Sequence, residues 1–198
     1  MLICFTGLHA AGKSYFLNKI PEYFNFKIFD KKQILRKLYF LDTGRTDENW
    51  NLWYGQKFAE DPVGIVSRIL SCLPLEENVI LDAVHSNYEW EIIKSLIPDS
   101  HLALIVTPPQ EREIRWANRE TIPRNLTALD KKRIKYWHNP KAENDCLPAQ
   151  ASWTFNGAAS EELMVQEFQE FLAYLAKEKE LEQKQEDIRK LSLRKKNE

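Results

Sequence analysis

The feature that most constrains this chain is an eight-residue pattern close to its first residue. Residues 7–14 read GLHAAGKS, which matches the pattern GxxxxGK[ST]. The apolar segment 2–6 before the pattern is typical of a short buried strand. The segment 15–20 after it suits a helix, which Pro21 is expected to end. A strand, a glycine-bounded loop and a helix in this order predict the first unit of an α/β fold.

This arrangement is typical of a P-loop, which binds the phosphates of a nucleoside triphosphate. Gly7 and Gly12 permit backbone angles that other residues resist, so that successive N–H groups can turn toward the anion. The N-terminus of the following helix adds unpaired N–H groups and the positive end of its dipole. We expect Lys13 to reach the β- and γ-phosphates and the Ser14 hydroxyl to hold Mg²⁺. The loop residues expected to contact the nucleotide are Gly7, His9, Ala10, Ala11, Gly12, Lys13, Ser14 and Tyr15.

The composition predicts a soluble globular protein. The chain has 198 residues, 43% of them hydrophobic and 29% charged, which is enough to bury a core in one domain. A net charge of −1 creates no global positive field toward nucleic acid or an anionic membrane, although a local basic groove is compatible with it. No apolar run approaches the length of a membrane span, and the first residues lack the layout of a signal peptide. Three widely spaced cysteines (Cys4, Cys72, Cys146) in no metal-binding pattern indicate reduced thiols in a cytoplasmic protein.

Apolar runs alternate with helical stretches, which predicts an α/β fold with a mostly parallel sheet of about five strands. The strands are expected at residues 2–6, 26–29, 79–82, 102–106 and 153–155. Helices are expected at 31–41, from Pro62, and at 88–97, 109–120 and 126–137, with a last one starting near Ser160. On the first of these, Ile34, Leu35, Leu38 and Leu41 mark the expected buried face. The domain is expected to span residues 1–176, and the charged tail at 177–198 either extends the last helix or frays.

Charged residues follow several of these elements. Asp82 ends the apolar run 79–82, where a carboxylate beside the P-loop strand can hold a water of the Mg²⁺ shell. A carboxylate that only caps the next helix is the alternative. Arg112, Arg115 and Arg119 are spaced by three and four residues and share one helix face. Their guanidinium groups suit the migrating phosphoryl group or stacking on adenine, and a solvated stripe paired with neighbouring glutamates is the competing interpretation. Arg115 and Arg119 are the stronger candidates.

With these motifs in place, residues 2–175 resemble the P-loop kinases of small metabolites, the group of nucleoside monophosphate kinases and dephospho-CoA kinase. Residues 79–86, VILDAVHS, resemble the family strand VVIDGxRS, with Asp82 on its aspartate and His85 in place of its arginine. Residues 106–112, VTPPQER, resemble the PPxxR entry into the lid. Residues 155–163, FNGAASEEL, resemble the closing turn NxGSxEEL, stretched by one residue, which approaches the adenine in that family.

The resemblance implies a three-layer P-loop NTPase fold with a helical lid at about residues 109–140 and an acceptor-covering segment at about 31–75. It implies an ATP- and Mg²⁺-dependent phosphotransferase acting on a small nucleotide-like acceptor, of the deoxynucleoside monophosphate or dephospho-CoA type. Asp30, after the second strand, is expected to take the proton of the acceptor hydroxyl as general base. The implied catalytic residues are Lys13, Asp30, Asp82, Arg115 and Arg119, and Arg115 and Asn156 are expected at the nucleotide.

The acceptor half departs most from the family. Lys31 and Lys32 follow Asp30 where dephospho-CoA kinases usually have a second acid, and Arg36 either binds an acceptor phosphate or lies in solvent. The aromatic residues of the acceptor-covering segment either stack on a base or pack against the body of the protein. These residues are Trp50, Trp53 and Tyr54. The sequence has no NKxD pattern, which reads guanine in other proteins, and it does not decide whether the nucleotide is ATP or GTP.

Two other functions remain open from the sequence. A kinase acting on a hydroxyl of a nucleic acid is kept in view by the basic stretch 131–137, KKRIKYW. The second is a protein that binds nucleotide without catalysis and thereby switches its contact with a partner, and the charged tail would form that contact.

Overall fold

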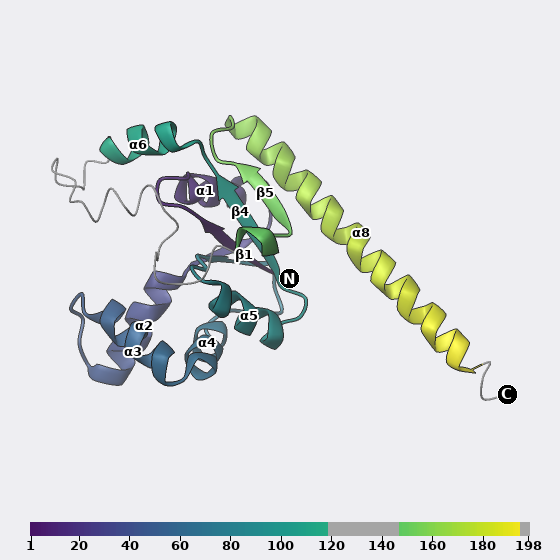
Figure 1. The fold of residues 1–198 in the computed structure, drawn as a ribbon, viewed down its shortest axis with the longest axis horizontal. Coiled ribbons are helices and arrows are strands. Elements are labelled where there is room, and N and C mark those ends of the chain that lie inside the picture. Colours follow the sequence, from purple (N-terminus) through teal and green to yellow (C-terminus); the bar gives the residue numbers. More distant parts are fainter. Residues whose placement is uncertain (119–146, 195–198) are drawn as a thin grey trace. The chain divides into compact units, whose positions relative to one another are not determined.

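The structure is a computed structural model that describes residues 1–118 and 147–194. Five parallel strands form one sheet in the order β2-β3-β1-β4-β5, which confirms the predicted α/β class. Figure 1 labels three of these strands, β1, β4 and β5. The strands are β1 Leu2–Gly7, β2 Lys27–Asp30, β3 Val79–Asp82, β4 His101–Val106 and β5 Trp153–Asn156. The helices of residues 1–118 are α1 Lys13–Tyr23, α2 Lys31–Thr43, α3 Trp50–Glu60, α4 Pro62–Leu70, α5 Asn87–Leu96 and α6 Pro109–Ala117. A short 3₁₀ turn covers Pro148–Gln150, and α8 spans Glu161–Arg194.

Helices cover both faces of the sheet because successive strand side chains point to opposite sides. Leu2 and Cys4 of β1 belong to the core cluster that Val66 of α4 and Ile93 of α5 also join. Phe5 points to the other face, where its ring lies 5.5 Å from that of Phe16 in α1. The central strands are continuous apolar runs, as strands covered on both faces require.

The register of the sheet places three candidate residues along its carboxyl edge. Asp82 lies opposite Phe5 of β1 on one side and opposite Asp30 of β2 on the other. Gly7, which opens the P-loop, ends β1 two residues beyond Phe5. The parallel arrangement therefore gathers the loop and both aspartates at the edge where α/β folds bind their ligands.

Two local predictions were wrong. Pro21 does not end α1, because it stands in the last turn and the Phe24 N–H still bonds to the Ile20 carbonyl at 2.9 Å. Leu41 is 64% exposed, whereas Tyr39 is buried. Because helical residues advance by about 100° each, Leu41 lies at the margin of a buried face that runs from Lys31 to Tyr39. The helix expected at 126–137 and the part of the lid beyond residue 118 lie outside the described residues.

The chain forms two compact units, residues 1–159 and 160–198. In the second unit α8 is one continuous helix that runs to Arg194. Pairs four residues apart stabilise it, such as Glu186 with Lys190 at 2.6 Å and Gln183 with Asp187 at 3.0 Å. None of the described helices combines the length and the apolar character needed to cross a membrane. Cys4 and Cys72 are free thiols, and burial raises the pKa of Cys4 above its ordinary value.

Candidate active site

The loop between β1 and α1 curls through two left-handed residues. Ala10 has a φ of 59° and Gly12 a φ of 94°, and the Ala11 N–H bonds back to the Leu8 carbonyl at 3.2 Å. α1 then begins with the Phe16 N–H on the Gly12 carbonyl at 3.0 Å. The sequence GLHAAGKS thus folds as a compact loop that leads into a helix N-terminus, the geometry that binds phosphate.

The Lys13 side chain turns back over this loop. Its Nζ donates to the Gly7 carbonyl at 2.7 Å and to the Leu8 carbonyl at 3.3 Å. Burial raises the pKa of Asp82 and the Lys13 charge opposes that rise, so the ammonium lies within electrostatic reach of the carboxyl edge of β3. The lysine therefore stands between the loop and the edge of the sheet.

A pocket of about 520 Å³ opens over the loop, a size typical of small-molecule sites. Its lining residues are His9, Ala10, Ala11, Gly12, Lys13, Ser14, Tyr15, Arg115, Gly157 and Ala159. The predicted nucleotide-contacting residues from His9 to Tyr15 and Arg115 are thus brought together. The pocket lining does not include Gly7 or Asn156. The structure therefore joins the loop, α6 and the turn after β5 around one cavity.

The two described arginines of helix α6 have different surroundings. Arg115 Nη1 donates to the Gly157 carbonyl at 2.8 Å, and Nη2 pairs with Glu111 at 3.2 Å. Arg112 is buried, and its Nε donates to the Thr107 carbonyl at 3.1 Å. Burial lowers the pKa of Arg112 from its ordinary value. Arg115 alone of this pair reaches the pocket, and Arg119 lies outside the described residues.

The turn after β5 packs directly on the P-loop. Asn156 Oδ1 accepts a hydrogen bond from the Ala158 N–H at 3.0 Å, so the side chain stabilises the turn. A Cβ built on Gly157 would lie 2.1 Å from the Ala11 carbonyl oxygen and 2.3 Å from Thr107 Oγ1. The Thr107 hydroxyl itself donates to the Ala11 carbonyl at 2.8 Å. Glycine at 157 thus permits the close approach, and Gly157 and Ala159 line the pocket where the sequence pointed to Asn156.

Replacing Gly157 with alanine is expected to destabilise the protein by about 2 kcal/mol, because the added methyl group meets backbone and a buried hydroxyl. Gly55 in α3 is the matched control, since nothing lies within 4 Å of its Cβ position. Gly55→Ala is expected to raise stability by about 1 kcal/mol through helix propensity. Urea unfolding of both variants measures the effects. Equal changes in the two variants would contradict the close packing of the turn on the P-loop.

Asp82 ends β3, and one of its carboxylate oxygens, Oδ1, is buried without a hydrogen bond from the described residues. Burial raises the pKa of the Asp82 carboxyl, the Asp30 charge adds to the rise, and Lys13 and Lys31 oppose it. An unpaired buried carboxylate oxygen is unfavourable by itself and suits a hydrated cation.

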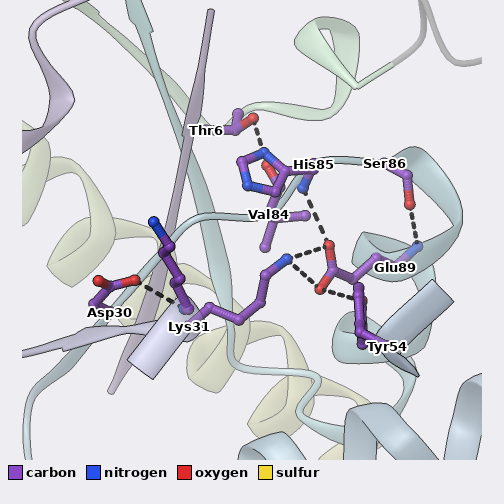
Figure 2. Close-up of polar contacts among 9 residues, drawn as sticks. Thr6, Asp30, Lys31, Tyr54, Val84, His85, Ser86 and Glu89 are labelled. Atoms are coloured by element: carbon purple, nitrogen blue, oxygen red, sulfur yellow. Dashed lines mark hydrogen bonds and ion pairs between the residues drawn. The ribbon is translucent and has the colours of Figure 1, made fainter. Parts of the chain in front are cut away.

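Asp30 lies next to Asp82 in the sheet register and caps α2. Its Oδ1 accepts a hydrogen bond from the Lys32 N–H at 2.8 Å (Figure 2). The cap fixes the carboxylate at the end of β2. It therefore has a structural role in addition to the proposed catalytic one.

Glu89 in α5 is a buried polar residue near the candidate aspartates that the sequence did not single out. It is buried and lies 2.7 Å and 2.8 Å, through its two oxygens, from the Nζ of Lys31. It also accepts from the Tyr54 hydroxyl at 3.2 Å and from the His85 N–H at 3.1 Å (Figure 2). The sequence did contain a pattern that could have drawn attention to Glu89, because Ser86-x-x-Glu89 matches the capping box of a helix N-terminus. Ser86 Oγ does accept from the Glu89 N–H, at 3.1 Å.

The aromatic residues of the segment expected to cover the acceptor pack against the body of the protein. Trp53 is 8% exposed, with its ring 5.8 Å from that of Tyr39. Trp50 is partly buried against the same core and lies 5.8 Å from the guanidinium of Arg36. Arg36 pairs with Glu48 at 2.6 Å. The packing alternative therefore describes Trp53, and Arg36 lies on the exposed face of α2 with Glu48 as its partner.

No protein-family model and no curated protein sequence matches the chain. Solved structures do resemble it. A shikimate kinase from Aquifex aeolicus aligns with a TM-score of 0.57 at 19% identity, over 89% of this chain and 98% of its own. A gluconokinase from Sinorhizobium meliloti aligns with a TM-score of 0.56 at 16% identity, over 91% and 95%. The APS kinase of Mycobacterium tuberculosis aligns with a TM-score of 0.53 at 15% identity, over 87% and 96%. At these identities the likeness concerns architecture: the chain has the α/β fold of these kinases.

Proposed function

We propose that this protein is an ATP- and Mg²⁺-dependent phosphotransferase that moves the γ-phosphoryl group to a small acceptor. One observation carries the proposal. The P-loop pocket lies on the same sheet edge as a buried Asp82 carboxylate oxygen that has no partner among the described residues. A carboxylate at this place suits the Mg²⁺ that accompanies the transferred phosphoryl group. The fold shared with several small-molecule kinases supports the same conclusion.

The residues of this edge fit the metal that such a reaction uses. Mg²⁺ takes few ligands from a protein and keeps several waters. Within residues 1–118 and 147–194, no group of three or more His, Cys, Asp or Glu side chains is placed to hold a metal. The Ser14 hydroxyl and the Asp82 carboxylate would hold Mg²⁺, Asp82 through a water. When bound, the ion would neutralise charge on the transferring phosphoryl group.

The other residues have roles that follow from their charge and place. Lys13 binds the phosphates and compensates the negative charge that develops on them. Arg115 borders the pocket from α6 and orients the nucleotide from the side of the Gly157 turn. Asp30, fixed by its cap at the end of β2, takes the proton of the acceptor hydroxyl. Arg119 is proposed as a second lid cation on the spacing of the arginines alone.

For the acceptor we propose a nucleotide-like molecule, of the deoxynucleoside monophosphate or dephospho-CoA type, on the strength of the motif resemblance. The names of the similar structures widen the choice, because those proteins are a shikimate kinase, a gluconokinase and an APS kinase. All of these candidates are small molecules that carry a hydroxyl or a phosphate oxygen able to accept a phosphoryl group.

A panel of acceptors tests the function. The full chain is incubated with ATP, Mg²⁺ and, separately, each nucleoside monophosphate, dephospho-CoA, shikimate, gluconate, APS, and single-stranded DNA and RNA. We expect ADP release and a phosphorylated product with a small acceptor, and none when Mg²⁺ is removed with EDTA. Product from DNA or RNA alone would favour the nucleic-acid kinase. Nucleotide binding without turnover on any acceptor would favour the switch.

A further inference from the structure

A single buried carboxylate joins the segments that surround the acceptor half of the site. Glu89 is 3% exposed, and its two oxygens accept from Lys31 Nζ, the Tyr54 hydroxyl and the His85 N–H. These contacts use all the hydrogen bonds that a carboxylate can accept, because its two oxygens have about four lone-pair positions. Figure 2 shows the three groups converging on Glu89, with Asp30 beside Lys31.

The partners of Glu89 come from three parts of the chain. Lys31 is the residue after Asp30 and begins α2, and Tyr54 belongs to α3 in the acceptor-covering segment. His85 lies three residues beyond Asp82, in the connection from β3 to α5. The Thr6 hydroxyl, one residue before the P-loop, donates to the Val84 carbonyl at 2.8 Å in the same connection. Glu89 thus contacts residues that lie one and three positions from the two candidate aspartates, and the connection that contains His85 is itself hydrogen-bonded to β1.

Stability alone is a poor explanation for such a pair. Taking an ammonium and a carboxylate out of water is expensive, and apolar replacements of a buried ion pair are often neutral or stabilising. Directional hydrogen bonds from a buried charge instead hold their partners at defined positions. The Lys31 side chain is 5% exposed, so the ion pair does not serve as a surface contact.

We propose that Glu89 is a positioning residue: by holding Lys31, Tyr54 and the His85 main chain, it sets the distance between helix α3 and the carboxyl edge of β2 and β3. It thereby determines how the acceptor is presented to the phosphoryl donor. This inference rests on the proposed function, and it assigns acceptor recognition, rather than nucleotide binding, to the Glu89 cluster.

Tyr54→Phe is the mildest test, because it removes one hydroxyl and leaves the ion pair. We expect KM for the acceptor to rise about tenfold, the effect of losing one hydrogen bond to a charged group. The Kd for the ATP analogue AMPPNP should stay unchanged. Tyr39→Phe is the matched control: its hydroxyl donates to Asp47 at 2.8 Å in the same acceptor-covering segment, away from Glu89. An unchanged acceptor KM in Tyr54→Phe, or an equal rise in Tyr39→Phe, would overturn the proposal.

The double variant Lys31→Met with Glu89→Gln separates positioning from stability. It removes both buried charges together, so thermal unfolding should return close to wild type, whereas Glu89→Gln alone leaves Lys31 uncompensated. We expect the acceptor KM of the double variant to stay raised. Recovery of both the melting temperature and the acceptor KM would reduce the cluster to a structural role.

Amide hydrogen exchange supplies a readout that needs no acceptor. We expect faster exchange at the His85 N–H and in α3 for Tyr54→Phe than for Tyr39→Phe. If the wild type binds AMPPNP but turns over no acceptor, the proposed function fails while exchange still tests the cluster. Identical exchange in the two variants would contradict the positioning role in either case.

Discussion

Lys13→Ala is expected to lower kcat/KM for phosphoryl transfer by at least about 10³-fold, the effect of removing a cation that neutralises charge in the transition state. Lys13 is the side chain that lies over the P-loop, with Nζ 2.7 Å from the Gly7 carbonyl oxygen. No arginine or lysine elsewhere in the loop replaces it, since residues 7–14 contain a single cation of this kind. The loss should appear in kcat as well as in KM, because the charge on the phosphoryl group grows during transfer.

Lys19→Ala is the matched control for this variant. Lys19 lies on the same helix α1 and pairs with Glu22 at 3.3 Å. A coupled assay of ADP release should give Lys19→Ala a rate close to that of wild type. Thermal unfolding should show that both variants are folded. Activity of Lys13→Ala close to that of wild type would remove the P-loop pocket from the reaction.

Asp82→Asn is expected to lower kcat by about 100-fold, the effect of losing a group that holds a metal-bound water. The same variant should be more stable than wild type at neutral pH. Burial raises the pKa of Asp82 above its ordinary value, so the ionised form is less favourable in the folded than in the unfolded chain. Loss of activity together with a gain in melting temperature is a combination that a simple packing defect does not produce.

The dependence of this gain on pH follows from the direction of the shift. Below the ordinary pKa of an aspartic acid, both states carry the proton and the carboxyl exerts no penalty. As the pH rises through the ordinary value toward the raised one, the unfolded chain releases the proton first, so the folded state loses stability relative to it. The advantage of Asp82→Asn should therefore grow over this range and stay constant above the raised pKa.

Thermal unfolding as a function of pH measures this advantage. Glu76→Gln, which changes an exposed carboxylate ahead of β3, serves as the control and should show no such trend. Asp82→Asn with unchanged kcat would exclude Asp82 from the metal site. A melting temperature below that of wild type at neutral pH would mean that the buried carboxylate is compensated in the fold.

The local elements of the site were predictable because each depends on neighbouring residues. Gly7 and Gly12 bracket the P-loop within eight residues, and Asp82 ends an apolar run that any buried strand would show. Helix spacing predicted that Arg112 and Arg115 would share one face of α6. It could not say that Arg112 would be buried against the Thr107 carbonyl while Arg115 reached the pocket, because the rotation of α6 against its surroundings decides this.

The sequence was sufficient to predict that a strand, a P-loop motif and a helix open an α/β fold, and that carboxylates end two further strands. It did not show which distant groups meet, because that depends on how the elements pack. The Lys31–Glu89 pair joins residues 58 positions apart, and the Arg115–Gly157 bond joins residues 42 apart. Periodicity describes which face of an element is buried and carries no information about which other element covers it. The P-loop could therefore be predicted from one contiguous motif, whereas the cluster around Glu89 depends on long-range contacts that the strand order creates.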